Sequence, residues 1–169
     1  MYQELLPQFR PLKIKFTYRK VPFFIGLFQR FGLLHEFGEI IKIKEYKKNI
    51  FTTDGKESLI ARMAGGVSNG EVTYLALGSG TTTPIAGDAL LETETFRKLL
   101  TQRIAGALIL TVKLFITSIE GNATYKEMGL FGDAATAVAN SGTLFTHLAI
   151  NETKTYGQSA TIEYIITAS

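Results

Sequence analysis

Residues 12–19, Leu-Lys-Ile-Lys-Phe-Thr-Tyr-Arg, alternate apolar and polar side chains without a break. Successive side chains of a β-strand point to opposite faces, so a period of two predicts a strand with one buried face. Residues 39–46 repeat this pattern. Two half-buried strands are therefore expected in the first fifty residues.

From residue 71 onward, short apolar segments are separated by turn residues such as Gly121-Asn122 and Gly132-Asp133. We expect strands over residues 72–77, 104–117, 123–130, 143–150 and 160–167. The segment 104–117 is long for one strand, so we expect a bend near Gly106. The regular spacing predicts a mainly β fold, an antiparallel β-sandwich that is jelly-roll-like.

One short helix interrupts this pattern. Thr53 or Asp54 can cap a helix that runs through Met63 and ends at Gly65-Gly66. Helical spacing places Leu59, Ile60 and Met63 on one face.

Charge divides the chain into two parts. Residues 1–50 contain ten Lys and Arg against four Glu, whereas residues 51–169 contain eight against eleven acidic residues. We predict a basic, Phe-rich N-terminal extension or arm over residues 1–48 and a β-sandwich domain over residues 49–169, with the folded body beginning near Asn49.

The extension carries an unusual number of aromatic side chains, and its periodicity fits either a short helix or a hydrophobic loop. A dense apolar segment rarely faces water, so we expect it to pack on its own body or on a neighbouring subunit. The predicted assembly contacts are Phe23, Phe24, Phe28, Phe31 and Phe37.

A basic cluster alternates with apolar residues over 41–48; its lysines are Lys42, Lys44, Lys47 and Lys48. The strand period favours one solvated face of a half-buried strand. An acidic protein neighbour and nucleic acid are the alternatives, and phosphate binding would need the charge gathered on one face without apolar residues between.

Several kinds of site are excluded by the residues present. The chain has no cysteine, and its two histidines, His35 and His147, are far apart in sequence, so no metal site or other cofactor is expected. Residues 21–30 are apolar at their start, but Arg30 interrupts them well short of the roughly 20 residues of a membrane span. No secretory signal is predicted.

Catalytic motifs are also missing. Gly78-Ser79-Gly80-Thr81-Thr82 resembles a phosphate-binding loop but lacks its lysine. No serine lies in a Gly-x-Ser-x-Gly turn. Glu94 and Arg97, three residues apart, would be neighbours on a helix but on opposite faces of a strand. We expect no enzymatic activity.

Four short motifs follow one another in the last hundred residues: Leu75-Ala76-Leu77-Gly78-Ser79-Gly80-Thr81-Thr82-Thr83-Pro84, Leu91-Glu92-Thr93-Glu94-Thr95-Phe96-Arg97, Tyr125-Lys126-Glu127-Met128-Gly129-Leu130-Phe131, and Gly142-Thr143-Leu144-Phe145 with Lys154-Thr155. Their order and spacing resemble a group of bacteriophage virion proteins of tails, baseplates and fibres. The resemblance covers about residues 49–167.

This resemblance implies a structural component of a virion, assembled in the host cytoplasm, that acts by contacts with copies of itself and with neighbouring virion proteins. A capsid decoration or head-to-tail connector, and a receptor- or carbohydrate-binding module at a fibre tip, are the alternatives. Because Arg97 and Glu127 both belong to the shared motifs, we expect them to form a structural ion pair.

Overall fold

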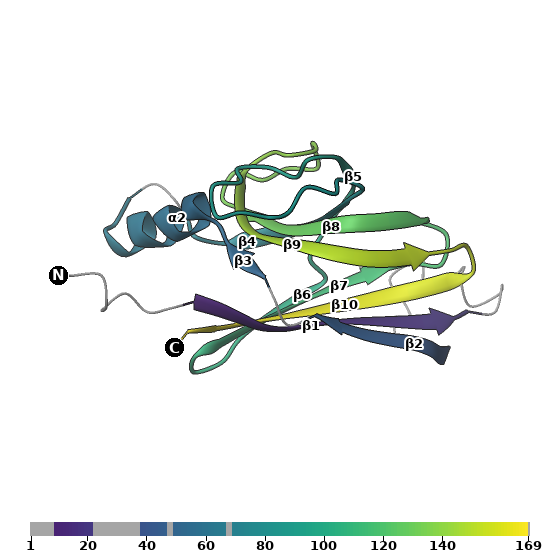
Figure 1. The fold of residues 1–169 in the computed structure, drawn as a ribbon. Coiled ribbons are helices and arrows are strands. Elements are labelled where there is room, and N and C mark those ends of the chain that lie inside the picture. Colours follow the sequence, from purple (N-terminus) through teal and green to yellow (C-terminus); the bar gives the residue numbers. More distant parts are fainter. Residues whose placement is uncertain (1–8, 22–37, 47–48, 67–68, 169) are drawn as a thin grey trace.

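The computed structural model describes residues 9–21, 38–46, 49–66 and 69–168. Within them, two antiparallel five-stranded sheets face each other, and one short helix lies at the end of the sandwich where the strand from Phe9 begins and the strand to Ala168 ends (Figure 1). The expected mainly β fold, an antiparallel sandwich with a short helix, is confirmed.

Sheet A, the lower layer of Figure 1, has the strand order β2 (Glu39–Tyr46), β1 (Phe9–Lys20), β10 (Gln158–Ala168), β7 (Ile109–Ile116) and β6 (Gln102–Ala105). Sheet B, the upper layer, has the order β3 (Ile50–Phe51), β9 (Thr143–Lys154), β8 (Ala123–Gly132), β4 (Val72–Gly78) and β5 (Glu94–Leu99).

The predicted boundary near Asn49 is wrong, because strands from both sides of it form one sheet. β1 pairs with β10 from Phe9 opposite Ala168 to Lys20 opposite Gln158. Its alternate residues Ile14, Phe16 and Tyr18 are at most 2% exposed and belong to the main core. The residues ahead of Asn49 thus include a strand that the sandwich needs.

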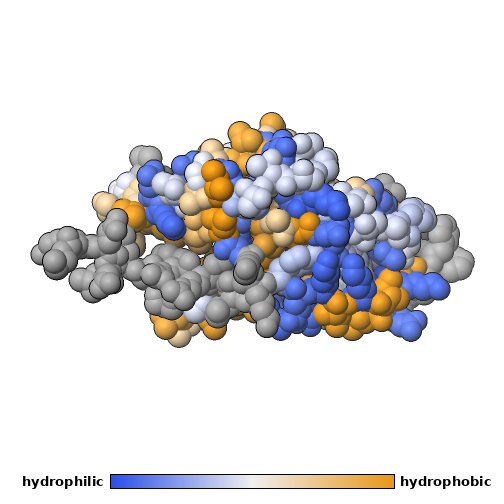
Figure 2. Space-filling model, in the orientation of Figure 1, coloured by the Kyte–Doolittle hydropathy of each residue, from blue (hydrophilic) through white to orange (hydrophobic). Residues whose placement is uncertain are grey.

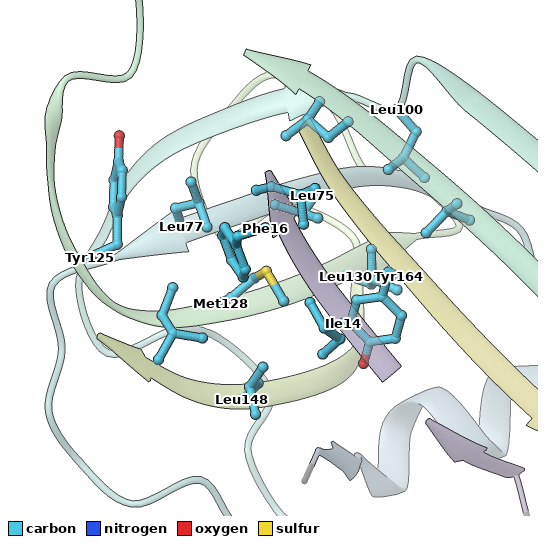
Figure 3. Close-up of a cluster of buried hydrophobic side chains, with 14 of the residues drawn as sticks. Ile14, Phe16, Leu75, Leu77, Leu100, Tyr125, Met128, Leu130, Leu148 and Tyr164 are labelled. Atoms are coloured by element: carbon cyan, nitrogen blue, oxygen red, sulfur yellow. The ribbon is translucent and has the colours of Figure 1, made fainter. Parts of the chain in front are cut away.

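The main core fills the space between the two sheets. Figure 3 shows Phe16 of β1 lying against Leu77 and Met128 of sheet B, with Tyr164 of β10 nearby. Burying an aromatic or large aliphatic side chain stabilises the fold by roughly 1.5 to 3 kcal/mol. The apolar alternation that predicted the strands is therefore also what holds the sheets together.

Helix α2 (Thr53–Met63) begins one residue earlier than expected and buries a different face. Its N-cap is Thr52, whose hydroxyl accepts a hydrogen bond from the Gly55 amide at 3.1 Å. A side chain at Gly55 would place Cβ 2.6 Å from the Phe145 Cα, so the helix rests directly on β9. Its buried residues are Gly55 and Ser58, whereas Met63 is 80% exposed.

The single bent strand predicted over residues 104–117 is instead a hairpin. β6 and β7 pair antiparallel, and the Gly106 amide donates to the Ile109 carbonyl at 2.7 Å across the turn. The break at Gly106 was predicted correctly, but the chain reverses there instead of bending. Turn geometry this tight cannot be distinguished from a bend by apolar periodicity.

Candidate functional site

Two long loops lie over the outer face of sheet B, at the top of Figure 1, and we call this surface the loop face. Residues 79–93 connect β4 to β5, and residues 133–142 connect β8 to β9. The loops meet where the Leu91 amide donates to Asn140 Oδ1 at 3.0 Å and Asn140 Nδ2 donates to the Leu91 carbonyl at 3.2 Å. Neither loop contains a regular strand or helix, so other contacts must order them.

A second, smaller core lies beneath the loop face, and its buried members are Ala76, Leu91, Phe131 and Leu144. Ala76 alternates with residues of the main core, so its side chain points to the outer face of the sheet. Gly129 makes room for this core, because a Cβ there would lie 2.6 Å from Leu144 Cδ1 and 3.2 Å from Leu91 Cδ2. Leu91 thereby anchors loop 79–93 on the sheet.

Glu127 of β8 is the central polar anchor of loop 79–93. Its carboxylate is 2% exposed and accepts hydrogen bonds from the backbone amides of Gly80 at 3.0 Å, Glu92 at 3.0 Å and Thr93 at 2.7 Å. A fourth contact joins Oε2 to His147 Nε2 at 3.1 Å. A buried carboxylate with this many donors is fully satisfied, so it orders the loop without an arginine.

The glycines of the Gly-Ser-Gly-Thr segment are needed because a side chain would collide with neighbouring atoms, and not because the backbone adopts a conformation that favours glycine. Neither Gly78 nor Gly80 has a positive φ. A Cβ on Gly80 would lie 2.5 Å from Glu127 Oε1, and Gly78 is equally close to the same carboxylate. These glycines therefore let the loop backbone approach Glu127, whereas an anion-binding role would leave that space open.

Glu92 holds the next part of the same loop. Its Oε2 accepts hydrogen bonds from the amides of Thr81 at 2.7 Å and Thr82 at 2.8 Å. These hydrogen bonds, that of Thr82 first, lower the pKa of the Glu92 carboxyl below its ordinary value. The residues that suggested a phosphate loop thus bind a carboxylate of the chain itself.

Arg97 pairs with Glu94 and not with Glu127, so the predicted Arg97–Glu127 ion pair is wrong. Arg97 Nε and Nη2 donate to the two Glu94 oxygens at 2.7 Å and 2.9 Å, and both side chains are at most 3% exposed. The two residues share a face because a bulge interrupts β5: Phe96 lies opposite Leu77, but Glu94 lies opposite Gly78, which leaves Thr95 as the extra residue.

The Arg97–Glu94 pair anchors loop 133–142. Arg97 Nη1 donates to the carbonyls of Thr136 at 3.1 Å and Ser141 at 2.9 Å, and Glu94 accepts from the Asn140 amide at 2.8 Å. The guanidinium also lies over the Phe131 ring, 4.2 Å from its centroid. One buried ion pair therefore fixes both the path of the loop and its distance from the sheet.

Lys154 anchors the turn before β8 in a similar way. It is 2% exposed, and its Nζ donates to the Glu120 carbonyl at 2.7 Å and to Asn122 Oδ1 at 2.8 Å. Burial lowers the pKa of Lys154 to about 8, with the nearby positive charge of Lys98 acting in the same direction. The Lys-Thr motif thus supplies another loop anchor.

Lys42 and Lys44 of β2 keep 44% and 38% of their side-chain surface exposed, as expected for a solvated face, but they lie on the side of the strand that faces sheet B, and the isoleucines that alternate with them are exposed on the other side. Lys42 and Lys44 lie opposite Tyr18 and Phe16 of β1 and therefore share the core-facing side. Both bind Glu152 of β9, at 2.8 Å and 3.2 Å, and the Glu152 side chain has no exposed surface. Burial opposes ionisation of Glu152, but hydrogen bonds from these lysines and two tyrosines bring its pKa below the ordinary value.

Consequently, the basic strand joins sheet A to sheet B at the edge of the sandwich. Lys47 and Lys48 lie outside the described residues. His35 and the predicted assembly contacts also lie outside them, namely Phe23, Phe24, Phe28, Phe31 and Phe37.

The sites described so far offer no arrangement that could bind and convert a substrate. Both ring nitrogens of His147 are engaged, by Glu127 and by Asp88 at 2.7 Å, so neither faces a substrate. A cavity of about 250 Å³ at the open end between the sheets is lined by apolar residues such as Phe51, Val72 and Leu110. Catalytic pockets combine such lining with a few placed polar groups.

Among the described residues, no cluster of His, Asp and Glu has an arrangement that could hold a metal ion, and no helix is long and apolar enough to span a membrane. Comparisons of the chain with protein-family models, with curated proteins and with solved structures give no match.

Proposed function

We propose that the chain is a structural component of a bacteriophage virion, in the tail, baseplate or fibre, and that it acts by subunit assembly. The observation that supports this proposal is the position of the motif residues. Gly80, Glu94, Arg97, Glu127 and Lys154 all lie in buried or partly buried contacts that order loops, and none of them lines the apolar cavity beside Phe51.

Ordered loops suit a docking role for a physical reason. Association must offset the loss of loop and side-chain freedom, so an interface made from flexible loops binds weakly. On the loop face, Glu127 and the Arg97–Glu94 pair have already fixed loops 79–93 and 133–142 in the folded subunit. A neighbouring subunit would therefore meet a preformed surface.

Exposed apolar side chains occur on both surfaces that could meet a neighbour. The loop face exposes Ile85, Leu90 and Val138 by more than half. On sheet A, the edge strand β2 exposes Ile40, Ile41 and Ile43, and Figure 2 shows apolar surface at this edge bordered by hydrophilic residues. Exposed apolar surface bordered by polar residues, as at the β2 edge, is typical of protein contact sites.

The proposal is tested by looking for the chain in assembled particles. Particles released from cells that carry the gene are purified by density gradient and digested for mass spectrometry. We expect peptides of this chain in a fixed ratio to other virion proteins. Expression in the cells without the chain in purified particles would contradict the proposal. Gold labelling of a C-terminal tag would then separate a tail, baseplate or fibre position from a capsid or connector position.

A further inference from the structure

Lys154 ends β9 beside the side chain of Asn122, the residue before β8. In the ladder of these two strands, Lys154 lies opposite Ala123. Its Nζ donates hydrogen bonds to Asn122 Oδ1 at 2.8 Å and to the Glu120 carbonyl at 2.7 Å. Because a carbonyl carbon lies about 1.2 Å from its oxygen, Nζ is no more than about 4 Å from the amide carbon of Asn122. Reacting atoms are held about 3 to 3.5 Å apart, so a small movement would bring this pair within range.

The surroundings of Nζ suit an uncharged amine. An ammonium group has three N–H donors, whereas a neutral amine has two and a lone pair. Among the described residues Nζ has two acceptors, Asn122 Oδ1 and the Glu120 carbonyl, and Lys154 is only 2% exposed. Burial lowers the pKa of Lys154 to about 8, although the Glu120 carboxylate acts in the opposite direction. A lysine that has lost its proton in this way is a nucleophile.

Glu120 also supplies a carboxylate that can carry a proton. It interacts electrostatically with Lys154. Its Oε1 accepts hydrogen bonds from Lys98 Nζ and from the Thr117 amide, the second at 2.9 Å. Within the described part of the chain no donor is bonded to Oε2, so this oxygen can take a proton from the amine and pass it on.

We propose that Lys154 and Asn122 join in an amide bond within the chain. The lone pair of Lys154 Nζ attacks Asn122 Cγ, and the bond between Cγ and Nδ2 breaks. One hydrogen of the amine moves through Glu120 to the departing nitrogen, which leaves as ammonia. The reaction uses no oxidant and no second molecule. This inference is independent of the proposed role in a virion.

The bond would replace a hydrogen-bonded anchor with a covalent one. It ties the turn before β8 to the end of β9 and closes a loop over residues 122–154. A cross-link of this kind restricts the unfolded chain and thereby stabilises the fold. Before the bond forms, Lys154 keeps an amine that titrates.

A second lysine–asparagine pair on the same two strands provides a matched comparison. Lys126 Nζ donates to Asn151 Oδ1 at 2.6 Å, but this contact is exposed. A lysine in water is protonated at neutral pH and has no lone pair to attack with. We therefore expect the amide bond at Asn122 and not at Asn151.

Mass spectrometry of the denatured full chain tests the proposal. After incubation at about pH 9, where the Lys154 amine is mostly uncharged, we expect a mass lower than that of the sequence by one molecule of ammonia. Trypsin should then release the peptide that contains Asn122 joined to Lys154. A chain that keeps the full mass of its sequence, or one that loses ammonia without this joined peptide, would overturn the proposal.

Three variants locate the bond. Asn122 is exposed, so Asn122→Ala should fold and keep its full mass, whereas the control Asn151→Ala should lose ammonia like the original chain. Glu120→Gln retains the carbonyl that binds Lys154 but not the carboxylate, so it should react more slowly. Loss of ammonia from Asn122→Ala would overturn the proposal, and an unchanged rate in Glu120→Gln would overturn the role of Glu120.

Discussion

The outer faces of the two sheets are ordered in different ways. On sheet B, loops 79–93 and 133–142 are irregular, and buried charged groups such as Glu127 and Arg97 satisfy their backbone. On sheet A, the edge strand β2 is ordered by its ladder with β1, and its outward isoleucines are exposed. Removing one side chain should therefore disrupt the loop face far more than the outer face of sheet A.

The largest effect is expected from Glu127→Ala. This change leaves three backbone amides, of which that of Gly80 is buried, without their acceptor, and it leaves His147 without one of its partners. Breaking a buried charged network by removing one member costs about 3 to 5 kcal/mol. Urea unfolding should show a loss of that size, whereas Glu57→Ala at an exposed site should stay within about 0.5 kcal/mol. A loss no larger than that of the control would show that Glu127 is not an anchor.

Arg97→Met tests the second anchor. It leaves Glu94 buried and unpaired, so we expect a loss of about 3 kcal/mol in the free energy of unfolding. The double variant Glu94→Gln with Arg97→Met removes the uncompensated charge and should recover part of that loss. If the free energy of unfolding of the double variant falls by the sum of the losses in the two single variants, Arg97 and Glu94 do not stabilise the fold as a coupled pair.

Gly80→Ala tests whether position 80 needs glycine because a side chain would collide with Glu127, and not because of the backbone conformation. A methyl group there meets Glu127, so overpacking should cost about 1 to 3 kcal/mol. Gly87 lies in the same loop, and a Cβ added there would meet no atom within 4 Å, so Gly87→Ala should leave stability unchanged or raise it by up to about 1 kcal/mol. Equal thermal midpoints for the two variants would contradict the close packing of Gly80 on Glu127.

The lowered pKa of Lys154 predicts that the free energy of unfolding depends on pH. Its pKa is lowered to about 8 in the fold, against about 10.4 for an unfolded lysine, so between these values the unfolded chain binds the extra proton. Stability should then rise with pH by up to about 1.4 kcal/mol per pH unit in that window. Urea unfolding of Lys154→Met should lack this component, and parallel stability curves for the two chains would refute it.

The smallest effect on stability is expected from Ile43→Thr on β2. Ile43 is 50% exposed, and threonine keeps the strand preference of a β-branched residue. The free energy of unfolding should change by no more than about 0.5 kcal/mol. Light scattering should nevertheless show weaker association if this edge meets a neighbouring subunit, and unchanged association would restrict assembly to the loop face.

The sequence predicts where the strands of this fold lie better than it predicts which strands pair with each other. Alternation identifies β1 because each inward residue, such as Phe16, is apolar. β1 pairs with β2, which follows it in the sequence, but also with the distant β10, and no local pattern specifies that second pairing. The boundary near Asn49 was wrong for this reason, since a change in composition does not reveal which strands share a sheet.

The candidate site was predictable only in part. Glu127 was expected to pair with Arg97, but its partners are His147 and backbone amides, which every residue carries. Arg97 and Glu94 meet through a bulge that strand periodicity cannot show. His147 and Glu152 were missed. Both are buried and paired, but Glu152 stands between Asn151 and Thr153, so its sequence neighbours give no signal of a buried group.

The pairing of β1 with β10 also has a consequence for synthesis. β1 is translated before the other described strands, but one of its two neighbours in sheet A, β10, is translated after all of them. Until residues 158–168 emerge, Ile14 and Phe16 have no complete core to enter, so the nascent chain must keep an apolar strand that lacks one neighbour from aggregating. Nascent chains that extend only to the residue before β10 should accordingly be the most dependent on chaperones.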